Sequence, residues 1–192
     1  MGKASQKPPT FMTADEFLAW DGDGTSTRYE LVDGVVRAMA PAAVNHGLIH
    51  AQLVYLLKRH VANGKLPCAV VDAPGIRPKA NSNANVRIPE IAITCSKLEA
   101  GLKTLPEPLV LVEILSPSNR ADTWSNVWTY LTIPSLQEVL IVESTKKDVK
   151  LLGRLPDGTW PEVPETISQL LRLKSLNFTT TVAEIYEGAP VR

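Results

Sequence analysis

The sequence predicts an α/β fold in which helices flank a mixed β-sheet. Two observations support this prediction: short apolar runs alternate with longer segments of helical spacing, and one run, residues 109–115, reads as a fully buried central strand. The chain has 192 residues, of which 44% are hydrophobic and 21% are charged, so it is long enough to bury a core. We expect residues 1–10 to be disordered and residues 11–192 to form a single domain.

The first elements are marked by local signals. Residues 13–16, Thr-Ala-Asp-Glu, form a capping box and predict a short helix, which the Asp-Gly repeat at 21–24 ends. Two apolar runs within residues 29–39 flank Asp33-Gly34. This dipeptide predicts a β-hairpin, because it tolerates the positive φ angles of a type I′ turn.

The following segments alternate between helix and strand. Residues 43–62 have helical spacing of apolar side chains and are followed by Gly64, which predicts a long helix packed on the sheet. After the central strand, Asp122 is expected to cap a second helix that runs to about Leu131. The remaining strands are predicted at 68–71, 75–78, 86–94, 138–142 and 149–155, with one more in a tail, 170–186, that ends in a helical turn.

Charge and cysteine content limit the class of function. With 20 basic and 20 acidic residues the formal net charge is zero, which argues against tight, non-specific DNA binding driven by charge but leaves room for a local basic patch. Cys68 and Cys95 are too few for a disulfide framework and lack metal-ligand spacing, so we expect reduced core thiols in a cytoplasmic protein. No apolar run approaches the ~20 residues that span a bilayer.

Three carboxylates stand in or beside apolar runs. Glu113 lies inside the central strand, Glu90 follows Pro89 and precedes an apolar run, and Glu30 precedes Leu31. An ionised carboxylate in such a setting is costly unless it is paired or holds a metal. If Glu90 lies on a strand next to that of Glu113, the two carboxylates can converge and suit Mg²⁺ or Mn²⁺. The other interpretation is structural: Glu113 pairs with a buried Arg or caps a backbone turn.

Several separated pieces of the sequence form a longer pattern. They are residues 17–20, 28–36 and 41–46, the run that begins at Pro89-Glu90, the strand around Glu113 with its following Ser-Pro-Ser, Tyr130 and Pro134. The strand and the Pro-Glu run resemble the PD-(D/E)xK nuclease core. The order and spacing of all the pieces, over about residues 12–145, resemble the Uma-two family of restriction endonucleases.

This resemblance implies a restriction-endonuclease-like fold and a Mg²⁺- or Mn²⁺-dependent endonuclease that hydrolyses the phosphodiester bonds of DNA. By position it implies that Glu30, Glu90 and Glu113 are catalytic acids and that the latter two hold the metal. Glu90 stands where the family usually has Asp, which lengthens that ligand by one methylene. His46 matches a family position near the acids, where it would contact phosphate or orient a ligand. Alternatively, His46 and His50, four apart on one helix face, bind zinc or lie at the surface.

The lysine of this nuclease pattern is missing. On the strand of Glu113, the position that shares its face is Leu115. In the family that the chain resembles, the lysine commonly sits on the next helix, at the position of Asn126, and the segment 122–131 contains no Lys or Arg. Arg87 and Arg120 are the nearby cations that could replace it. We therefore expect weakened or lost catalysis, and the alternative is a non-catalytic nucleic-acid-binding or scaffold protein that retains the fold.

Assembly is expected to be homodimeric. Restriction-endonuclease-like proteins often pair so that two sites meet two DNA strands, and two-fold symmetry is the commonest closed arrangement. Trp124, Trp128 and Trp160 are candidates for apolar surface that such an interface would cover.

Overall fold

The computed structural model describes residues 10–117 and 119–191 and confirms the α/β prediction. The disorder expected for residues 1–10 falls, apart from Thr10, outside these residues. In the described part of the chain the main sheet has six strands, in the spatial order β3 (Ala69–Asp72), β4 (Ile91–Thr94), β5 (Pro108–Leu115), β6 (Glu138–Glu143), β7 (Val149–Gly153) and β8 (Glu165–Ile167). Only β5 and β6 of these neighbours run parallel, because helix α3 (Arg120–Tyr130) crosses over between them.

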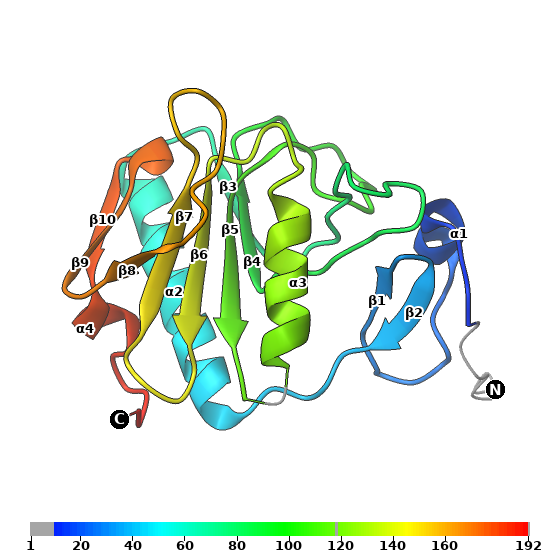
Figure 1. Ribbon diagram of the computed structural model, residues 1–192, viewed down its shortest axis with the longest axis horizontal. Helices are drawn as coiled ribbons and strands as arrows, with labels where there is room; N and C mark the ends of the chain where they lie inside the picture. Colours follow the sequence, from blue (N-terminus) through cyan, green and yellow to red (C-terminus); the bar gives the residue numbers. More distant parts are fainter. Residues whose placement is uncertain (1–9, 118, 192) are drawn as a thin grey trace.

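Helices cover both faces of this sheet (Figure 1). Helix α2 (Val44–Asn63), the predicted long helix, lies on one face, and α3 lies on the other. The side chains of β5 alternate between them: Val112 and Ile114 join the core that contains α2, whereas Leu111 and Leu115 join the core that contains α3. No helix in the described residues is long and apolar enough to cross a membrane.

The N-terminal elements follow the local signals. Helix α1 (Ala14–Ala19) is followed by a separate two-stranded sheet, β1 (Tyr29–Val32) and β2 (Val35–Ala38), which lies to one side of the main sheet (Figure 1). The capping box is confirmed, with Thr13 and Glu16 each accepting the other's backbone N–H. The hairpin turn is also confirmed: Asp33 and Gly34 have φ angles of 49° and 83°, which an Asp-Gly pair tolerates.

Two predicted strands are shorter in the structure. Residues 86–94 contribute β4 and two isolated bridges, at Val86 and Arg87, because Pro89 has no backbone N–H and interrupts the ladder. Residues 75–78 contribute an isolated bridge, in which Ile76 pairs with Arg87. This bridge holds the backbone of Arg87 outside the main sheet.

The second helix begins two residues before its predicted cap. Asn119 occupies the N-cap position of α3, and Asp122 lies within the first turn. Asp122 pairs instead with Arg37, whose Nη1 lies 3.4 Å from Oδ1 of the carboxylate. The Asn119 side chain accepts hydrogen bonds from the N–H and Oγ–H of Ser116 and so closes the turn after β5.

The tail forms a hairpin rather than the single strand predicted. Its elements are β9 (Leu170–Leu173), the 3₁₀ turn η1 (Lys174–Leu176), β10 (Phe178–Thr181) and helix α4 (Val182–Ile185), the last of which confirms the terminal helical turn. Asn177 reverses the chain with a φ of 49°, a conformation that Asn adopts more readily than most residues. Strand β8 was not predicted, because three edge residues are too few to show a period.

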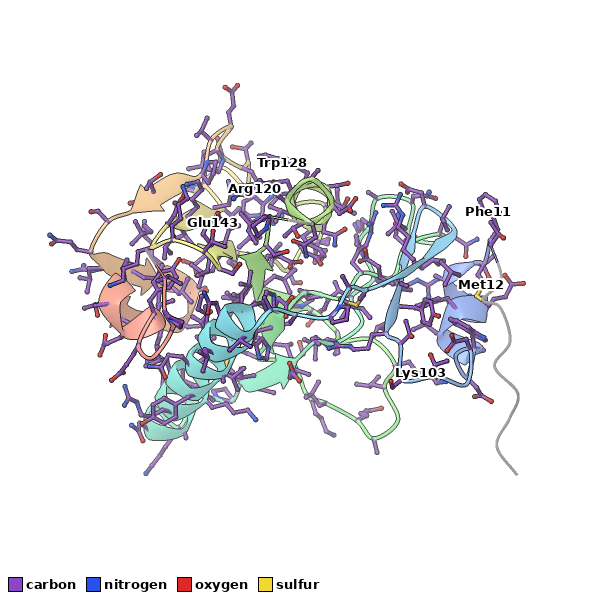
Figure 2. The ribbon with its side chains drawn as sticks, turned by 90° about the horizontal axis from the view of Figure 1, so that it is seen from below. Phe11, Met12, Lys103, Arg120, Trp128 and Glu143 are labelled. Atoms are coloured by element: carbon purple, nitrogen blue, oxygen red, sulfur yellow. A yellow bond between two sulfur atoms is a disulfide. The ribbon has the colours of Figure 1, made fainter. Side chains whose placement is uncertain are left out.

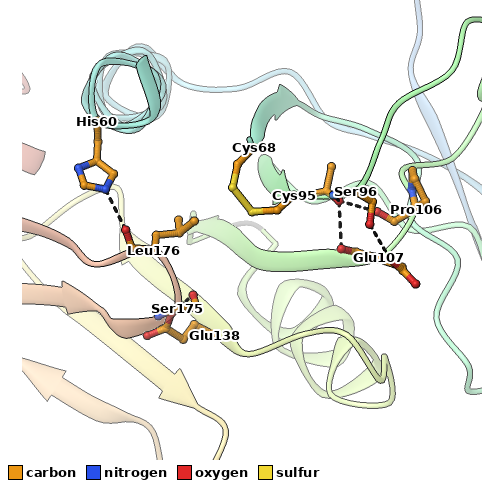
Figure 3. The surroundings of a disulfide bond; sticks show 10 residues. His60, Cys68, Cys95, Ser96, Pro106, Glu107, Glu138, Ser175 and Leu176 are labelled. Carbon is orange, nitrogen blue, oxygen red and sulfur yellow. Dashed lines mark hydrogen bonds between the residues drawn. A yellow bond between two sulfur atoms is a disulfide. The ribbon is translucent and has the colours of Figure 1, made fainter. Parts of the chain in front are cut away.

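The prediction of reduced thiols is wrong, because Cys68 and Cys95 form a disulfide (Figure 3). Ala69 pairs with Thr94 in the antiparallel ladder of β3 and β4, so the cysteines just outside that pair come opposite each other. Their Cα atoms are 3.9 Å apart, although 27 residues separate them along the chain. The sequence offered no sign of this pairing, because it depends on the register of two strands.

Candidate functional site

A cleft of about 1100 Å³ is lined by residues from the end of β5, the start of α2 and the β1–β2 hairpin. Its lining includes five of the predicted site residues, each from a different segment: Glu30, His46, Glu90, Glu113 and Asn126. The structure therefore brings the three acids predicted from the sequence to one cavity. Two other predicted residues, Arg87 and Arg120, are not in this lining.

Glu113 is buried at the bottom of the cleft. It is 5% exposed and lies on the α3 side of β5, between Leu111 and Leu115. Tyr130 Oη donates a hydrogen bond of 2.8 Å to Glu113 Oε1, so the partner is neither the Arg nor the backbone turn that a structural interpretation suggested. Burial raises the pKa of Glu113 well above its usual range, the nearby Glu90 raises it further, and the Tyr130 hydrogen bond opposes the rise.

Tyr130 is a suitable donor for this carboxylate. Burial and the neighbouring Glu113 raise the pKa of the phenol well above its usual value, so it keeps its proton. Asn126 and Tyr130 lie four apart on one face of α3, and both are buried. This spacing is the signal from which the support for Glu113 could have been inferred.

Glu90 lies next to Glu113. Ile91 pairs with Val112 in antiparallel register, so Glu90, just before β4, comes opposite Glu113 on β5. His46 Nε2 is 2.9 Å from Glu90 Oε1. At 6% exposed, His46 is not the surface histidine that the sequence left open.

His46 and His50, both on α2, contact different groups. His46 contacts the Glu90 carboxylate, whereas His50 Nε2 lies 3.0 Å from Asp72 Oδ1 and 3.2 Å from the Glu90 carbonyl oxygen. Both therefore brace the segment that carries Glu90. Within the described residues, no group of three or more His, Cys, Asp or Glu side chains is arranged to hold a metal ion. This finding gives no support to the zinc alternative.

Glu30, from the hairpin, is a third carboxylate in the lining of the cleft. Asn126 Nδ2 donates to Glu30 Oε2 over 3.2 Å, and Arg87 Nη1 donates to Asn126 Oδ1 over 2.7 Å. Burial raises the pKa of Glu30, while the Arg87 charge and the Asn126 hydrogen bond oppose that rise. Arg87 is thus connected to the cleft through Asn126.

Arg120 has a different partner. Its guanidinium pairs with the carboxylate of Glu143, which is 3% exposed at the end of β6 (Figure 2). Glu143 Oε1 is buried and has no hydrogen-bond partner among the described residues. Removal of Arg120 would leave a buried carboxylate without its cation, so the pair anchors the first turn of α3 to the sheet.

Comparison with known proteins identifies the family. A model of the Uma2 family, described as "Putative restriction endonuclease", matches residues 14–183. The chain belongs to the Uma2 family. It is 28% identical over 179 residues to "Uncharacterized protein slr1290" of Synechocystis sp., covering 92% of each chain. A crystal structure of "a putative nuclease belonging to DUF820" from Anabaena variabilis matches with a TM-score of 0.73 at 16% identity, over 92% of this chain and 98% of that one.

These findings confirm the restriction-endonuclease-like fold and the family that the sequence pattern resembles. Against that family's pattern, Leu115 is a core residue and Asn126 reaches the cleft as a neutral amide. The arginines that do line the cleft, Arg28 and Arg37, come from the hairpin region, and Arg37 is paired with Asp122. Among the described residues that line the cleft, none is a lysine.

Proposed function

We propose that this chain is a Mg²⁺- or Mn²⁺-dependent endonuclease that hydrolyses phosphodiester bonds in DNA, with slow catalysis. The observation that carries the proposal is the adjacency of Glu90 and Glu113 at one cleft, where burial makes an ionised Glu113 costly without a cation. Two carboxylates at an open cleft suit Mg²⁺, because this ion usually binds one or two carboxylates and keeps several water molecules as its other ligands. When bound, such a metal supplies an activated water and neutralises charge on the phosphate.

The residues of this chain have separate roles in the proposal. Glu90 and Glu113 hold the metal, with His46 fixing the Glu90 carboxylate and Tyr130 fixing that of Glu113. Glu30 is a further acid of the site, and its fixed side chain can orient water or accept a proton. Arg28 and Arg37 line the cleft and would meet the phosphate backbone of bound DNA.

Slow catalysis follows from the missing lysine. A cationic donor that touches the transition state is typically worth about 10²–10³ in rate, and neither Leu115 nor Asn126 provides a charge. We therefore expect weak nicking of supercoiled plasmid DNA in Mg²⁺.

Plasmid nicking with matched variants tests the proposal. Nicking should require divalent metal, stop with EDTA, and disappear in Glu113→Gln and Glu90→Gln. Glu162→Gln, an exposed glutamate outside the cleft, should nick like the wild type. Efficient wild-type nicking that Glu113→Gln abolishes would show that the lysine is dispensable. Nicking that survives both cleft variants would exclude the acids as the site.

The alternative is a non-catalytic nucleic-acid-binding or scaffold protein with the same fold. It is favoured by the fact that Tyr130 and His46 already satisfy oxygens of the two acids. Crystals soaked in Mn²⁺ separate the two functions. Density shared by Glu90 and Glu113 supports the endonuclease, whereas an empty position together with DNA binding and no nicking supports the alternative.

A further inference from the structure

We propose that Arg87 is a positioning residue that fixes the side-chain amide of Asn126, so that its NH₂ group faces Glu30 and the cleft. The geometry stands without any assumption about activity, whereas its consequence for DNA cleavage rests on the proposed function. Arg87 is 2% exposed and is not part of the cleft lining, so it acts through Asn126 rather than on a ligand.

The backbone around Arg87 is held in place. Its N–H donates to the Ile76 carbonyl over 2.9 Å, and the Ile76 N–H donates back over 2.7 Å. The side chain then reaches α3, where Nη1 meets Asn126 Oδ1 at 2.7 Å. An anchored backbone and a short charge-assisted hydrogen bond together define one position for the guanidinium.

The chemistry of the three groups allows only one orientation of the amide. Arginine carries donors and no acceptor, so the Asn126 oxygen must face Arg87. The NH₂ group then points at the Glu30 carboxylate, 3.2 Å away. A reversed amide would set donor against donor at Arg87 and oxygen against oxygen at Glu30.

This orientation presents the Asn126 NH₂ group to the cleft as a hydrogen-bond donor. The amide NH₂ has two hydrogens, and one of them is used by Glu30. Asn126 lines the cleft, and in this proposal its second hydrogen donates to an oxygen of a ligand there. For a phosphodiester, a preorganised donor at this place stabilises the oxygen on which negative charge develops. A buried guanidinium is costly to maintain, and here its charge polarises the donor that Asn126 presents.

The side-chain amide signal of Asn126 in ¹⁵N NMR spectra tests the positioning. The signal is assigned by its absence in Asn126→Asp. In the wild type, at least one Nδ2 proton should exchange slowly with solvent. In Arg87→Met that exchange should accelerate about tenfold or more, because the amide loses the bond that fixes it, whereas Arg87→Lys should retain much of the protection. Unchanged exchange in folded Arg87→Met would overturn the proposal. If that variant does not fold, the wild type decides, since two unprotected Nδ2 protons would also overturn it.

Activity separates this proposal from the proposed function. Arg87→Met should lower the nicking rate about tenfold while leaving Mn²⁺ affinity, measured by electron paramagnetic resonance, within about twofold, since Glu90 and Glu113 are untouched. Loss of both together would indicate a general structural role and count against positioning. Protected Nδ2 protons in a wild type that never nicks DNA would refute the endonuclease alone. Nicking that is indifferent to Arg87→Met, in a variant whose Nδ2 exchange has accelerated, would refute the consequence for cleavage and leave the positioning of the amide standing.

Discussion

The side chains of β5 alternate between two faces of the sheet, and the two faces differ in chemistry. Toward α2, Val110, Val112 and Ile114 are fully buried in an apolar core. On the face toward α3, Glu113 lies between the buried leucines Leu111 and Leu115. The first face is explained by apolar burial, which stabilises a fully buried side chain by about 1.5–3 kcal/mol. The second accepts a costly carboxylate and supports it with Tyr130.

This difference separates stability from function within one strand. A residue on the α2 side can be judged by the volume it fills. Glu113 can be judged only by its partners: Tyr130, the neighbouring Glu90 and whatever cation the cleft admits. Substitutions on the α2 face should therefore alter unfolding free energy and leave metal affinity unchanged, whereas substitutions at Glu113 should also alter how stability responds to pH and to metal.

Ile114→Ala should have the largest effect on stability. It removes a fully buried side chain from the core with α2 and leaves a cavity, which should cost about 2–5 kcal/mol of unfolding free energy in urea denaturation. Mn²⁺ affinity per folded molecule should stay unchanged, because the side chain points away from the cleft. A clear loss of metal affinity would show that the two faces are not independent.

Tyr130→Phe should cost about 1–3 kcal/mol, because it leaves the buried oxygen of Glu113 without its donor. Urea denaturation measures this loss. The double variant with Glu113→Leu, which removes the unsatisfied carboxylate, should recover part of it. Equal stability of Tyr130→Phe and the wild type would mean that water or another group replaces the phenol.

Glu113→Gln should change how stability depends on pH. The folded-state pKa of Glu113 is raised above its ordinary value of 4.5, so the folded protein holds this proton more tightly than the unfolded chain. The resulting stability is complete below that ordinary value and is lost as pH rises through the folded-state pKa. Since Gln does not ionise, the advantage of Glu113→Gln over the wild type should grow by up to about 1.4 kcal/mol per pH unit across this window in metal-free buffer.

Thermal or urea denaturation at a series of pH values, with and without Mg²⁺, measures this difference. Mg²⁺ should reduce it in the proposed endonuclease by stabilising the ionised wild-type site. A constant difference between the two proteins at all pH values would contradict the raised pKa.

Trp128→Ser should have the smallest effect on folding. Trp128 is 45% exposed on α3 (Figure 2) and stacks on Trp124. Trp160, by contrast, packs against the core on the α3 side of the sheet, and its Nε1 donates to the Leu131 carbonyl oxygen. Unfolding free energy should change by about 0.5 kcal/mol or less. If the homodimer expected from the sequence uses this face, light scattering should show a dimer in the wild type and a dimer weakened by the substitution. A wild-type mass near 20.9 kDa would refute the dimer.

Much of the site was predictable because it depends on conspicuous exceptions to a local pattern. Glu113 interrupts an apolar run, and Glu90 follows a proline at the start of another. Period two then placed Glu113 on a defined face of its strand. The cost of burying a carboxylate made these positions chemical candidates before any partner was known. The partners themselves, Tyr130 and His46, required the packing of both helices on the sheet.

The amino-acid sequence by itself determined the capping box at Thr13, the Asp33-Gly34 turn, the long helix and the two faces of β5, because these depend on residues a few positions apart. Only the tertiary structure decided which distant side chains meet. Arg87 and Asn126 are 39 residues apart, Asn126 and Glu30 are 96 apart, and Cys68 and Cys95 are 27 apart. Such pairs depend on strand register and on how α3 lies against the sheet, and a shift of one residue would turn a strand side chain such as Glu30 to the opposite face.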